Sequence, residues 1–146
     1  MDDLTFEEIT ELFYLALALW REARGESVEG RIAVACSIRN RVERPSWWGT
    51  TFDQVVTKKW QYSSLTDPHD PQLAKWPLIS DLTWIECLKI SKAVLDNETV
   101  NPVPGADSYH DVSIAPPAWT KTARKCGQIG KLLFYDVDLD FQGDTG

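Results

Sequence analysis

The chain has 146 residues, a length that favours one domain with a sizeable hydrophobic core. Hydrophobic residues make up 43% and charged residues 25%, the usual balance of a globular protein in water. The net charge of -7 argues against nucleic acid and anionic membranes as partners, because both are bound largely through Lys and Arg. We therefore expect a single catalytic or binding domain over residues 1–146 that acts as a monomer.

The N-terminal segment predicts neither export nor membrane insertion. Its sequence, MDDLTFEEIT, is acidic, whereas a signal peptide begins with basic residues followed by an apolar run. The longest apolar run, Leu12 to Trp20, is about half of the ~20 residues that a membrane-spanning helix needs. We therefore expect a protein that is made in the cytoplasm.

The three cysteines favour free thiols over a metal site or a disulfide. Cys36, Cys87 and Cys126 are odd in number and widely spaced. Only His69 and His110 could complete a zinc site with them. The sequence therefore predicts three buried thiols in a reducing compartment, no metal ion and no cofactor.

The first half of the chain predicts helices. Thr5 and Glu8 form a capping-box pattern, and the apolar residues after them recur at spacings of three and four, at Ile9, Phe13, Ala16, Trp20 and Ala23. This stripe predicts a core-facing helix that ends near Gly25. A second helix is expected between Ser27 and Pro45, a short one over residues 51–56, and a third long one from Ser80 or Asp81 to Leu95.

The remaining segments predict loops and a small sheet, so the fold class is α+β, mainly helical with a small antiparallel sheet. Residues 106–112 and 131–137 are the strand candidates, and an acidic tail from about residue 138 is expected to fray. Trp20 and Trp84 fit apolar helix faces. The loop-rich middle holds four more tryptophans, of which we expect one or two to line a binding groove: Trp47, Trp48, Trp60 and Trp76.

Glu22 is the first candidate for chemistry because it continues an apolar helix face. Leu15, Ala18 and Leu19 lie seven, four and three residues before it. A carboxyl at the border of the core is partly desolvated, which raises its pKa, and a general acid needs a raised pKa to hold a proton near neutral pH. Glu26, one turn further on, would also raise the pKa of Glu22 if the two carboxyl groups lie close together.

An alternative interpretation makes Glu22 a solvated helix end. In that case its carboxylate would pair with one of three nearby arginines, Arg21, Arg24 or Arg39. The residue pattern alone leaves both interpretations open.

Five groups of residues, in order, resemble the cell wall hydrolase family of spore-cortex-lytic enzymes, the SleB/CwlJ type. The first is Glu22-Ala23-Arg24-Gly25-Glu26 with the helix after it, through Glu29-Gly30, Ala33-Val34-Ala35, Ile38 and Asn40-Arg41-Val42. The others are Gln61-Tyr62-Ser63; Gly105-Ala106 with Tyr109-His110; Pro117-Ala118-Trp119; and Ile129-Gly130-Lys131 through Phe134-Tyr135. The resemblance covers roughly residues 12 to 136, nearly the whole chain.

This resemblance implies a lysozyme-like α+β domain that cleaves the glycan strand of peptidoglycan. In such enzymes the first Glu of the Glu-Ala-x-Gly-Glu motif, here Glu22, is the catalytic acid. The implied reaction is lytic transglycosylation between N-acetylmuramic acid and N-acetylglucosamine. The acid protonates the glycosidic oxygen and then, as a base, deprotonates the muramoyl C6 hydroxyl, which closes a 1,6-anhydro ring.

Two other classes of function stay open. A hydrolytic muramidase on the same scaffold would need a second carboxylate, ~5–5.5 Å away for retention or ~6.5–9.5 Å for inversion. Glu26, Asp107 and Asp111 are the candidates for it. A noncatalytic glycan-binding protein is the other alternative. The missing export signal fits a bacteriophage endolysin, which waits in the cytoplasm and reaches the wall after release across the membrane.

The other matched residues have candidate roles in binding the glycan. Gln61 and Ser63 could bond acetamido or hydroxyl groups, although either could serve only in a turn or cap. Tyr62 and Tyr109 could stack on sugars or bond Glu22, or could pack in the core. His110 could orient a ligand or Tyr109, but a single His is more often structural. We expect Asn40 and Arg41 to brace the fold.

Overall fold

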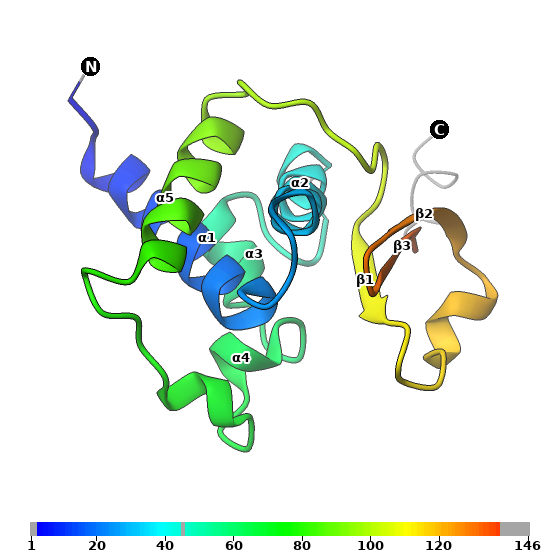
Figure 1. The fold of residues 1–146 in the computed structure, drawn as a ribbon. Helices are drawn as coiled ribbons and strands as arrows, with labels where there is room; N and C mark the ends of the chain where they lie inside the picture. The colour runs from blue at the N-terminus through cyan, green and yellow to red at the C-terminus, as the bar shows by residue number, and fades with distance from the viewer. Residues whose placement is uncertain (1–2, 45, 138–146) are drawn as a thin grey trace.

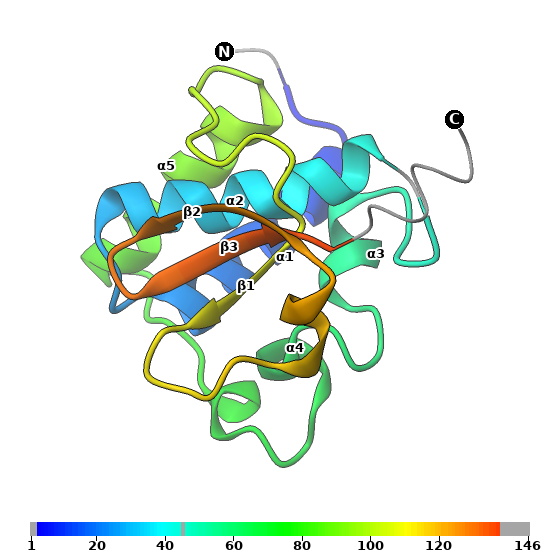
Figure 2. The ribbon, with the colours of Figure 1, turned by 90° about the vertical axis from the view of Figure 1, so that its right-hand side faces the viewer.

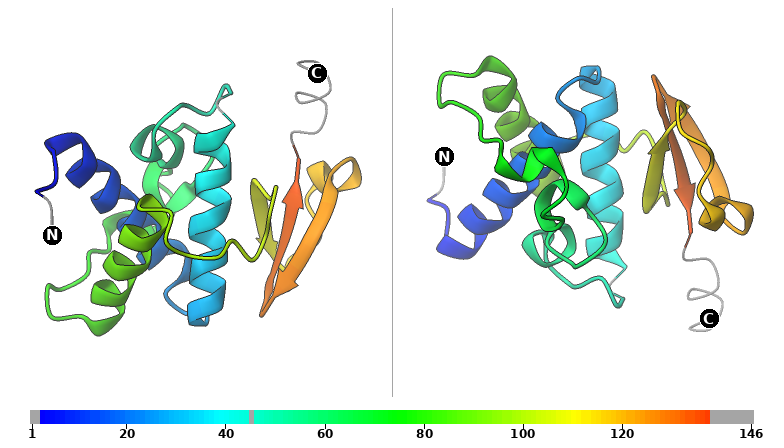
Figure 3. Two further views of the ribbon diagram at one scale, coloured as in Figure 1. Left: turned by 90° about the horizontal axis from the view of Figure 1, so that it is seen from above. Right: turned by 90° about the horizontal axis from the view of Figure 1, so that it is seen from below.

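The computed structural model describes residues 3–44 and 46–137. A group of helices and a three-stranded antiparallel sheet lie side by side, and helix α2 (Val28–Glu43) runs along the border between them (Figure 1). Views from above and below show the same arrangement (Figure 3). The predicted fold class, α+β and mainly helical with a small antiparallel sheet, is confirmed.

The predicted helices begin where local capping residues place them. Thr5 and Glu8 form the complete capping box of α1 (Phe6–Ala23). Side chains also cap α2, α3 (Phe52–Val56) and α5 (Leu82–Leu95), by Ser27, Thr51 and Asp81 in turn. Three short elements were not predicted, helix α4 (Ser63–Thr66) and the 3-10 helices η1 (Pro71–Ala74) and η2 (Ala118–Lys121). Four residues are too few to show a helical period.

Helix α1 differs from the predicted amphipathic helix. Its second half is central, and every residue from Leu15 to Arg21 is buried, because α2, α3 and α5 surround it. Its first half contacts α3 and α5 on one side and is open to solvent on the other, so Ile9 and Phe13 keep 46% and 38% of their surface exposed. The prediction that these two residues face the core is therefore wrong, whereas Ala16, Trp20 and Ala23 are buried as expected.

The sheet has the strand order β1-β3-β2. Strands β1 (Ser108–Asp111) and β3 (Leu132–Asp136) match the two predicted strands. Strand β2 (Arg124–Ile129) was not predicted, because its sequence, RKCGQI, lacks apolar alternation and its pairing with β3 shifts register between Lys125 and Gly127. The 3-10 helix η2 (Ala118–Lys121) lies between β1 and β2. The tail predicted from about residue 138 lies outside the described residues.

The sheet packs on α2 through one buried ring and several polar bonds. Figure 2 shows the three strands lying over α2. Phe134 of β3 is fully buried and joins the core formed by the helices. The Asn40 side-chain amide donates to the backbone oxygens of Val103 and Ala106, at 3.2 and 2.6 Å. Arg41 Nε donates to the backbone oxygen of Asp107 at 2.6 Å. Asn40 and Arg41 thus tie α2 to the segment that leads into β1, as expected for bracing residues.

The cysteines are free thiols, but only two are buried. Burial raises the pKa of the Cys87 thiol to about 11 and raises that of Cys36 as well. Cys126 lies on β2 and is partly exposed, so the prediction of three buried thiols is wrong at this position. Within residues 3–44 and 46–137, no helix combines the length and the apolar character needed to cross a bilayer.

Candidate active site

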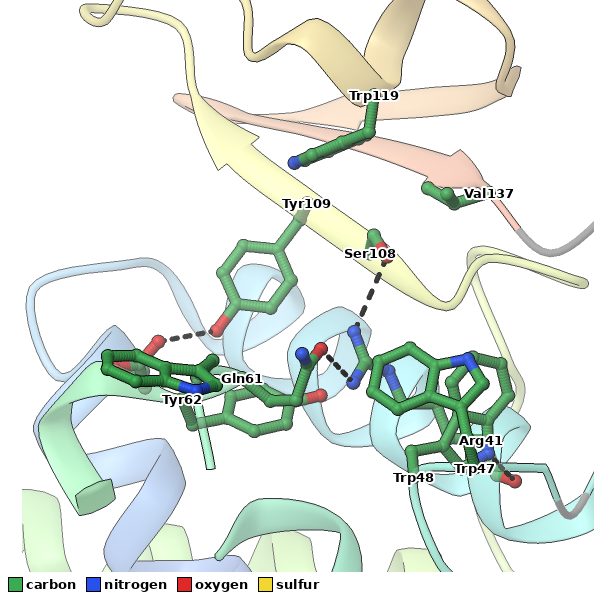
Figure 4. Close-up of a pocket in the computed structure, with 11 residues that line it drawn as sticks. Arg41, Trp47, Trp48, Gln61, Tyr62, Ser108, Tyr109, Trp119 and Val137 are labelled. Atoms are coloured by element: carbon green, nitrogen blue, oxygen red, sulfur yellow. Dashed lines mark hydrogen bonds between the residues drawn. The ribbon is translucent and has the colours of Figure 1, made fainter. Parts of the chain in front are cut away.

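A cavity of about 430 Å³ opens between the helices and the sheet. Figure 4 shows Tyr109 and Trp119 reaching it from the sheet side, opposite Gln61, Tyr62 and Trp48. Its lining comes from both parts of the fold and from residues far apart in sequence: Glu22, Arg41, Trp47, Trp48, Trp60, Gln61, Tyr62, Ser108, Tyr109, Trp119 and Val137. The structure thus brings together four of the predicted site residues, Glu22, Gln61, Tyr62 and Tyr109.

Glu22 lies at the end of α1 and is half-buried. Its Oε1 accepts a hydrogen bond of 2.9 Å from the Tyr109 hydroxyl (Figure 4). Burial, together with the adjacent Glu22 carboxylate, raises the pKa of Tyr109 well above its usual value. The Tyr109 hydroxyl therefore keeps its proton over the physiological range and acts as a permanent donor that orients the Glu22 carboxyl.

The arginines that could have neutralised Glu22 are engaged elsewhere. Arg21 Nε donates to the Lys75 oxygen at 3.0 Å, and the guanidinium of Arg24 lies over the ring of Trp20. Arg39 pairs with Glu43 at 3.3 Å. The interpretation of Glu22 as a salt-bridged helix end therefore has no support in the described part of the chain.

Arg41 joins the two sides of the cavity, a role beyond the bracing expected from sequence. Its Nη1 donates to Gln61 Oε1 at 3.1 Å and its Nη2 to Ser108 Oγ at 3.4 Å, as the dashed lines of Figure 4 show. The guanidinium also lies 5.1 Å from the ring centroid of Tyr62. The sequence carries one signal for this position, a basic residue within an otherwise buried helix face, but does not identify its partners.

Aromatic side chains form much of the cavity wall. Trp48 is buried and donates through Nε1 to the Arg41 oxygen at 2.9 Å, whereas Trp47 and Trp60 keep 55% and 80% of their surface exposed. Three of the four loop tryptophans thus line the cavity, where one or two were expected. Trp76 lies outside this lining and packs on Arg21, 4.5 Å from the guanidinium carbon to the ring centroid.

Trp119 was not singled out from sequence as a wall residue. Its ring packs at right angles to the rings of His110 and Tyr135, with centroids 6.0 and 5.4 Å away. His110 is buried and stacks on Tyr135, on the strand face opposite to Tyr109. His110 does not line the cavity and reaches it only through Trp119, a position that favours a packing role.

The other predicted residues also lie outside the cavity lining. Ser63 donates to Asp70 Oδ2 at 2.6 Å and borders a smaller neighbouring cavity. Glu26 Oε2 lies 4.0 Å from Lys131 Nζ. Asp111 Oδ1 accepts from the Ser113 backbone N–H at 2.8 Å, and hydrogen bonding to Ser113 lowers the pKa of Asp111.

Asp107, the remaining candidate for a second carboxylate, has a structural position. It is buried, and its Oδ1 accepts from the Val137 backbone at 2.9 Å and from the Ser108 hydroxyl at 3.0 Å. Its Oδ2 lies 3.7 Å from Arg44 Nη2. These contacts lock the segment before β1 onto β3, and they leave Asp107 outside the cavity lining.

The cavity suits a ligand that has both apolar faces and polar edges. Glu22 is its only carboxylate among the residues the structure describes, and Gln61 and Ser108 add neutral polar groups beside the aromatic walls. Side chains of this kind fit the C–H faces and hydroxyls of sugars. Across residues 3–44 and 46–137, no three His, Cys, Asp or Glu side chains lie together as metal ligands would.

A comparison with protein families decides which family this fold and cavity belong to. The family model described as Cell Wall Hydrolase matches residues 25–135. The chain belongs to the cell wall hydrolase family. It is therefore a peptidoglycan-cleaving enzyme, and peptidoglycan is its substrate class. The match begins three residues after Glu22, so the role of Glu22 rests on its geometry and on the Glu-Ala-x-Gly-Glu pattern.

Solved structures show the same fold. This cell wall hydrolase is similar to the catalytic domain of the germination-specific lytic transglycosylase SleB from Bacillus anthracis, with 22% identity and a TM-score of 0.69 over 92% of this chain and 98% of the other. The catalytic domain of the Bacillus cereus SleB protein matches with 24% identity and a TM-score of 0.64, over 87% and 90% of the two chains. The lysozyme-like α+β prediction is confirmed. A search of curated protein sequences gave no match.

The bond between Tyr109 and Glu22 leads to a testable expectation. Tyr109→Phe removes the hydroxyl and keeps the ring that packs on Phe134, with centroids 5.6 Å apart. We expect kcat to fall on the order of tenfold, because an oriented acid loses its donor, and KM to change little. Initial rates on purified peptidoglycan measure both constants. Parent-like kcat in the variant would show that the hydroxyl does not orient Glu22.

Proposed function

We propose that this enzyme cleaves glycan strands by lytic transglycosylation between N-acetylmuramic acid and N-acetylglucosamine, with Glu22 as acid and then base. The observation that carries the proposal is the Tyr109–Glu22 pair, in a cavity whose described lining holds no second carboxylate. Hydrolysis normally requires two carboxyl groups. An intramolecular attack by the substrate's own hydroxyl requires one.

The reaction uses one proton carrier in two steps. Protonated Glu22 gives its proton to the glycosidic oxygen, and the bond between that oxygen and muramoyl C1 breaks. The Glu22 carboxylate then accepts the proton of the muramoyl C6 hydroxyl, and the oxygen of that hydroxyl bonds to C1 and closes the anhydro ring. The products are a strand with a new N-acetylglucosamine hydroxyl and a strand that ends in 1,6-anhydromuramic acid. Glu22 regains its proton, so no water is consumed.

The neighbouring residues have matching roles in this proposal. Tyr109 holds the Glu22 carboxyl toward the cleaved bond, and Arg41 fixes the Gln61 amide through its oxygen. The Gln61 nitrogen is then placed to donate to an acetamido or hydroxyl oxygen of the substrate. Tyr62 forms part of the cavity floor, where burial raises the pKa of its hydroxyl and keeps it neutral. The similarity to a lytic transglycosylase catalytic domain adds support.

Mass spectrometry of the muropeptides released from purified peptidoglycan tests the reaction. We expect products that end in 1,6-anhydromuramic acid. Reducing muramoyl ends would instead establish a hydrolytic muramidase and require a second carboxylate. Binding without any release would leave a glycan-binding protein.

The biological use proposed for this activity is bacterial lysis, as by a bacteriophage endolysin made in the cytoplasm and released across the membrane. An enzyme that cuts the strands of an intact wall removes the wall's resistance to osmotic pressure. We therefore expect the purified protein to clear a suspension of outer-membrane-permeabilised bacteria. Optical density measures the effect, with Glu22→Gln as the control. An optical density that stays constant with both proteins would contradict the lytic role.

A further inference from the structure

Trp60 holds a backbone conformation that its side chain does not favour. Its φ is +72°, in the left-handed region. It is the third residue of the turn Lys58–Gln61, which is closed by a 3.1 Å hydrogen bond from the Gln61 N–H to the Lys58 oxygen. Turns with a positive φ at this position normally carry glycine. A tryptophan here costs stability on the order of 1 kcal/mol, and such strain is found most often at functional sites.

The Trp60 side chain gains little from packing that would offset this strain. It keeps 80% of its surface exposed, and its described ring contact is with Lys59, whose Nζ lies 4.9 Å from the ring centroid. An exposed tryptophan in a strained turn has no evident structural value. Its value must then lie in what the turn presents to the outside.

The position of Trp60 indicates what it presents. Trp60 lines the cavity that holds Glu22, and it also lines a second cavity of about 140 Å³. The other residues that line the second cavity are Lys59, Ser63, Thr66, Asp67 and Pro68. Trp60 therefore lies between two adjoining hollows, and Gln61 and Tyr62, which follow it directly, belong to the wall of the larger one.

We infer that Trp60 is the platform of an additional sugar-binding subsite, on which the glycan strand continues from the catalytic cavity into the second hollow. This inference rests on the proposed function. The ligand is one N-acetylated pyranose of the strand, beyond the two that flank the cleaved bond. The C–H face of a pyranose packs on the flat indole, and the hydroxyl and charged groups that line the second cavity can bond the hydroxyls of a sugar.

Binding to an inactive protein tests this subsite apart from catalysis. In a Glu22→Gln background, calorimetry measures the affinity for long peptide-free glycan strands and for a disaccharide, which spans only the two positions that flank the cleaved bond. We expect Trp60→Gly to weaken long-strand binding about tenfold, or roughly 1.4 kcal/mol, and to change disaccharide binding little. Trp60→Phe, which keeps an aromatic ring, should lose less. The melting temperature of Trp60→Gly should equal or exceed that of the parent, because glycine relieves the strained φ.

A second tryptophan provides the matched control. Trp76→Ala removes an indole that is also exposed, at 61%, but lies outside the lining of both cavities. It should leave the affinity for both ligands unchanged. Unchanged long-strand binding by Trp60→Gly, with an active parent, would overturn the subsite and leave the proposed function intact. A loss of binding with a lowered melting temperature would give Trp60 a structural role instead. A parent that neither binds nor cleaves glycan would overturn the proposed function and the subsite together.

Discussion

Glu22→Gln is expected to reduce the release of anhydromuramoyl products on the order of 10³-fold, because the amide cannot carry the proton that general acid catalysis transfers. The fold should persist. The amide oxygen of Gln can still accept the bond that the Tyr109 hydroxyl donates to Glu22 Oε1 at 2.9 Å. Mass spectrometry of released muropeptides measures the activity, and the melting temperature measures the fold. Substrate binding should be retained, since the substitution keeps the size and shape of the side chain.

Glu26 provides the matched control for this variant. It belongs to the same Glu-Ala-x-Gly-Glu pattern, but its carboxylate lies near Lys131 and outside the cavity lining. Glu26→Gln should therefore cleave peptidoglycan at close to the parent rate. An equal loss at both positions would contradict a mechanism with one carboxylate and favour the hydrolytic alternative. Full activity in Glu22→Gln would show that the acid is another residue.

Arg41→Ala is expected to lower the free energy of unfolding by about 3 kcal/mol, because one buried side chain supplies hydrogen bonds to three separate groups. The side chain is largely buried, and its bonds to the Asp107 oxygen, Gln61 Oε1 and Ser108 Oγ join α2 to the loop before α4 and to β1. Its loss leaves these acceptors without their donor and widens the cavity. Urea denaturation measures the stability, and initial rates on peptidoglycan measure the activity, which should fall as well.

Two further substitutions separate the shape of Arg41 from its charge. Arg41→Lys keeps the positive charge but cannot bond three groups from one planar fork, so we expect it to recover only part of the stability. Arg124, whose side chain is 55% exposed beside Asp136, is the control. Arg124→Ala should cost less than about 1 kcal/mol, because the Arg124 side chain is half exposed and Arg44 Nη1, 3.5 Å from the buried Asp136 carboxylate, still pairs with it. A cost at Arg41 as small as that at Arg124 would contradict the central role of Arg41.

Local signals in the sequence predicted the helices well. Thr5, Ser27, Thr51 and Asp81 cap helices because each bonds a backbone N–H two or three residues away, and a contact of this range can be read from neighbouring letters. Strands β1 and β3 and the α+β class were predicted from similar short-range patterns. The order of motifs along the chain also identified the family, since a family pattern is itself a property of the sequence.

Burial and surface position depended on contacts between distant segments. Ile9 and Phe13 continue the apolar stripe of α1, but the neighbouring helices cover this half of α1 only in part. Strand β2 lacks an apolar pattern of its own and is ordered by pairing with β3. Alternation along β1 separates Tyr109 from His110, yet only the packing of the sheet on α2 decides that Tyr109 is the one that faces Glu22.

The composition of the cavity was the least predictable feature. Glu22 and Tyr109 are 87 residues apart, and Arg41 meets Gln61 and Ser108 across 20 and 67 residues. The sequence could mark Glu22, Tyr109 and Gln61 as site candidates, because their side chains suit the chemistry. It could mark Arg41 as a residue that braces the fold. It could not show that they share one cavity, nor that Trp119 completes its wall. Those distances are set only when the sheet closes on α2, through the sum of many weak contacts that no single segment encodes.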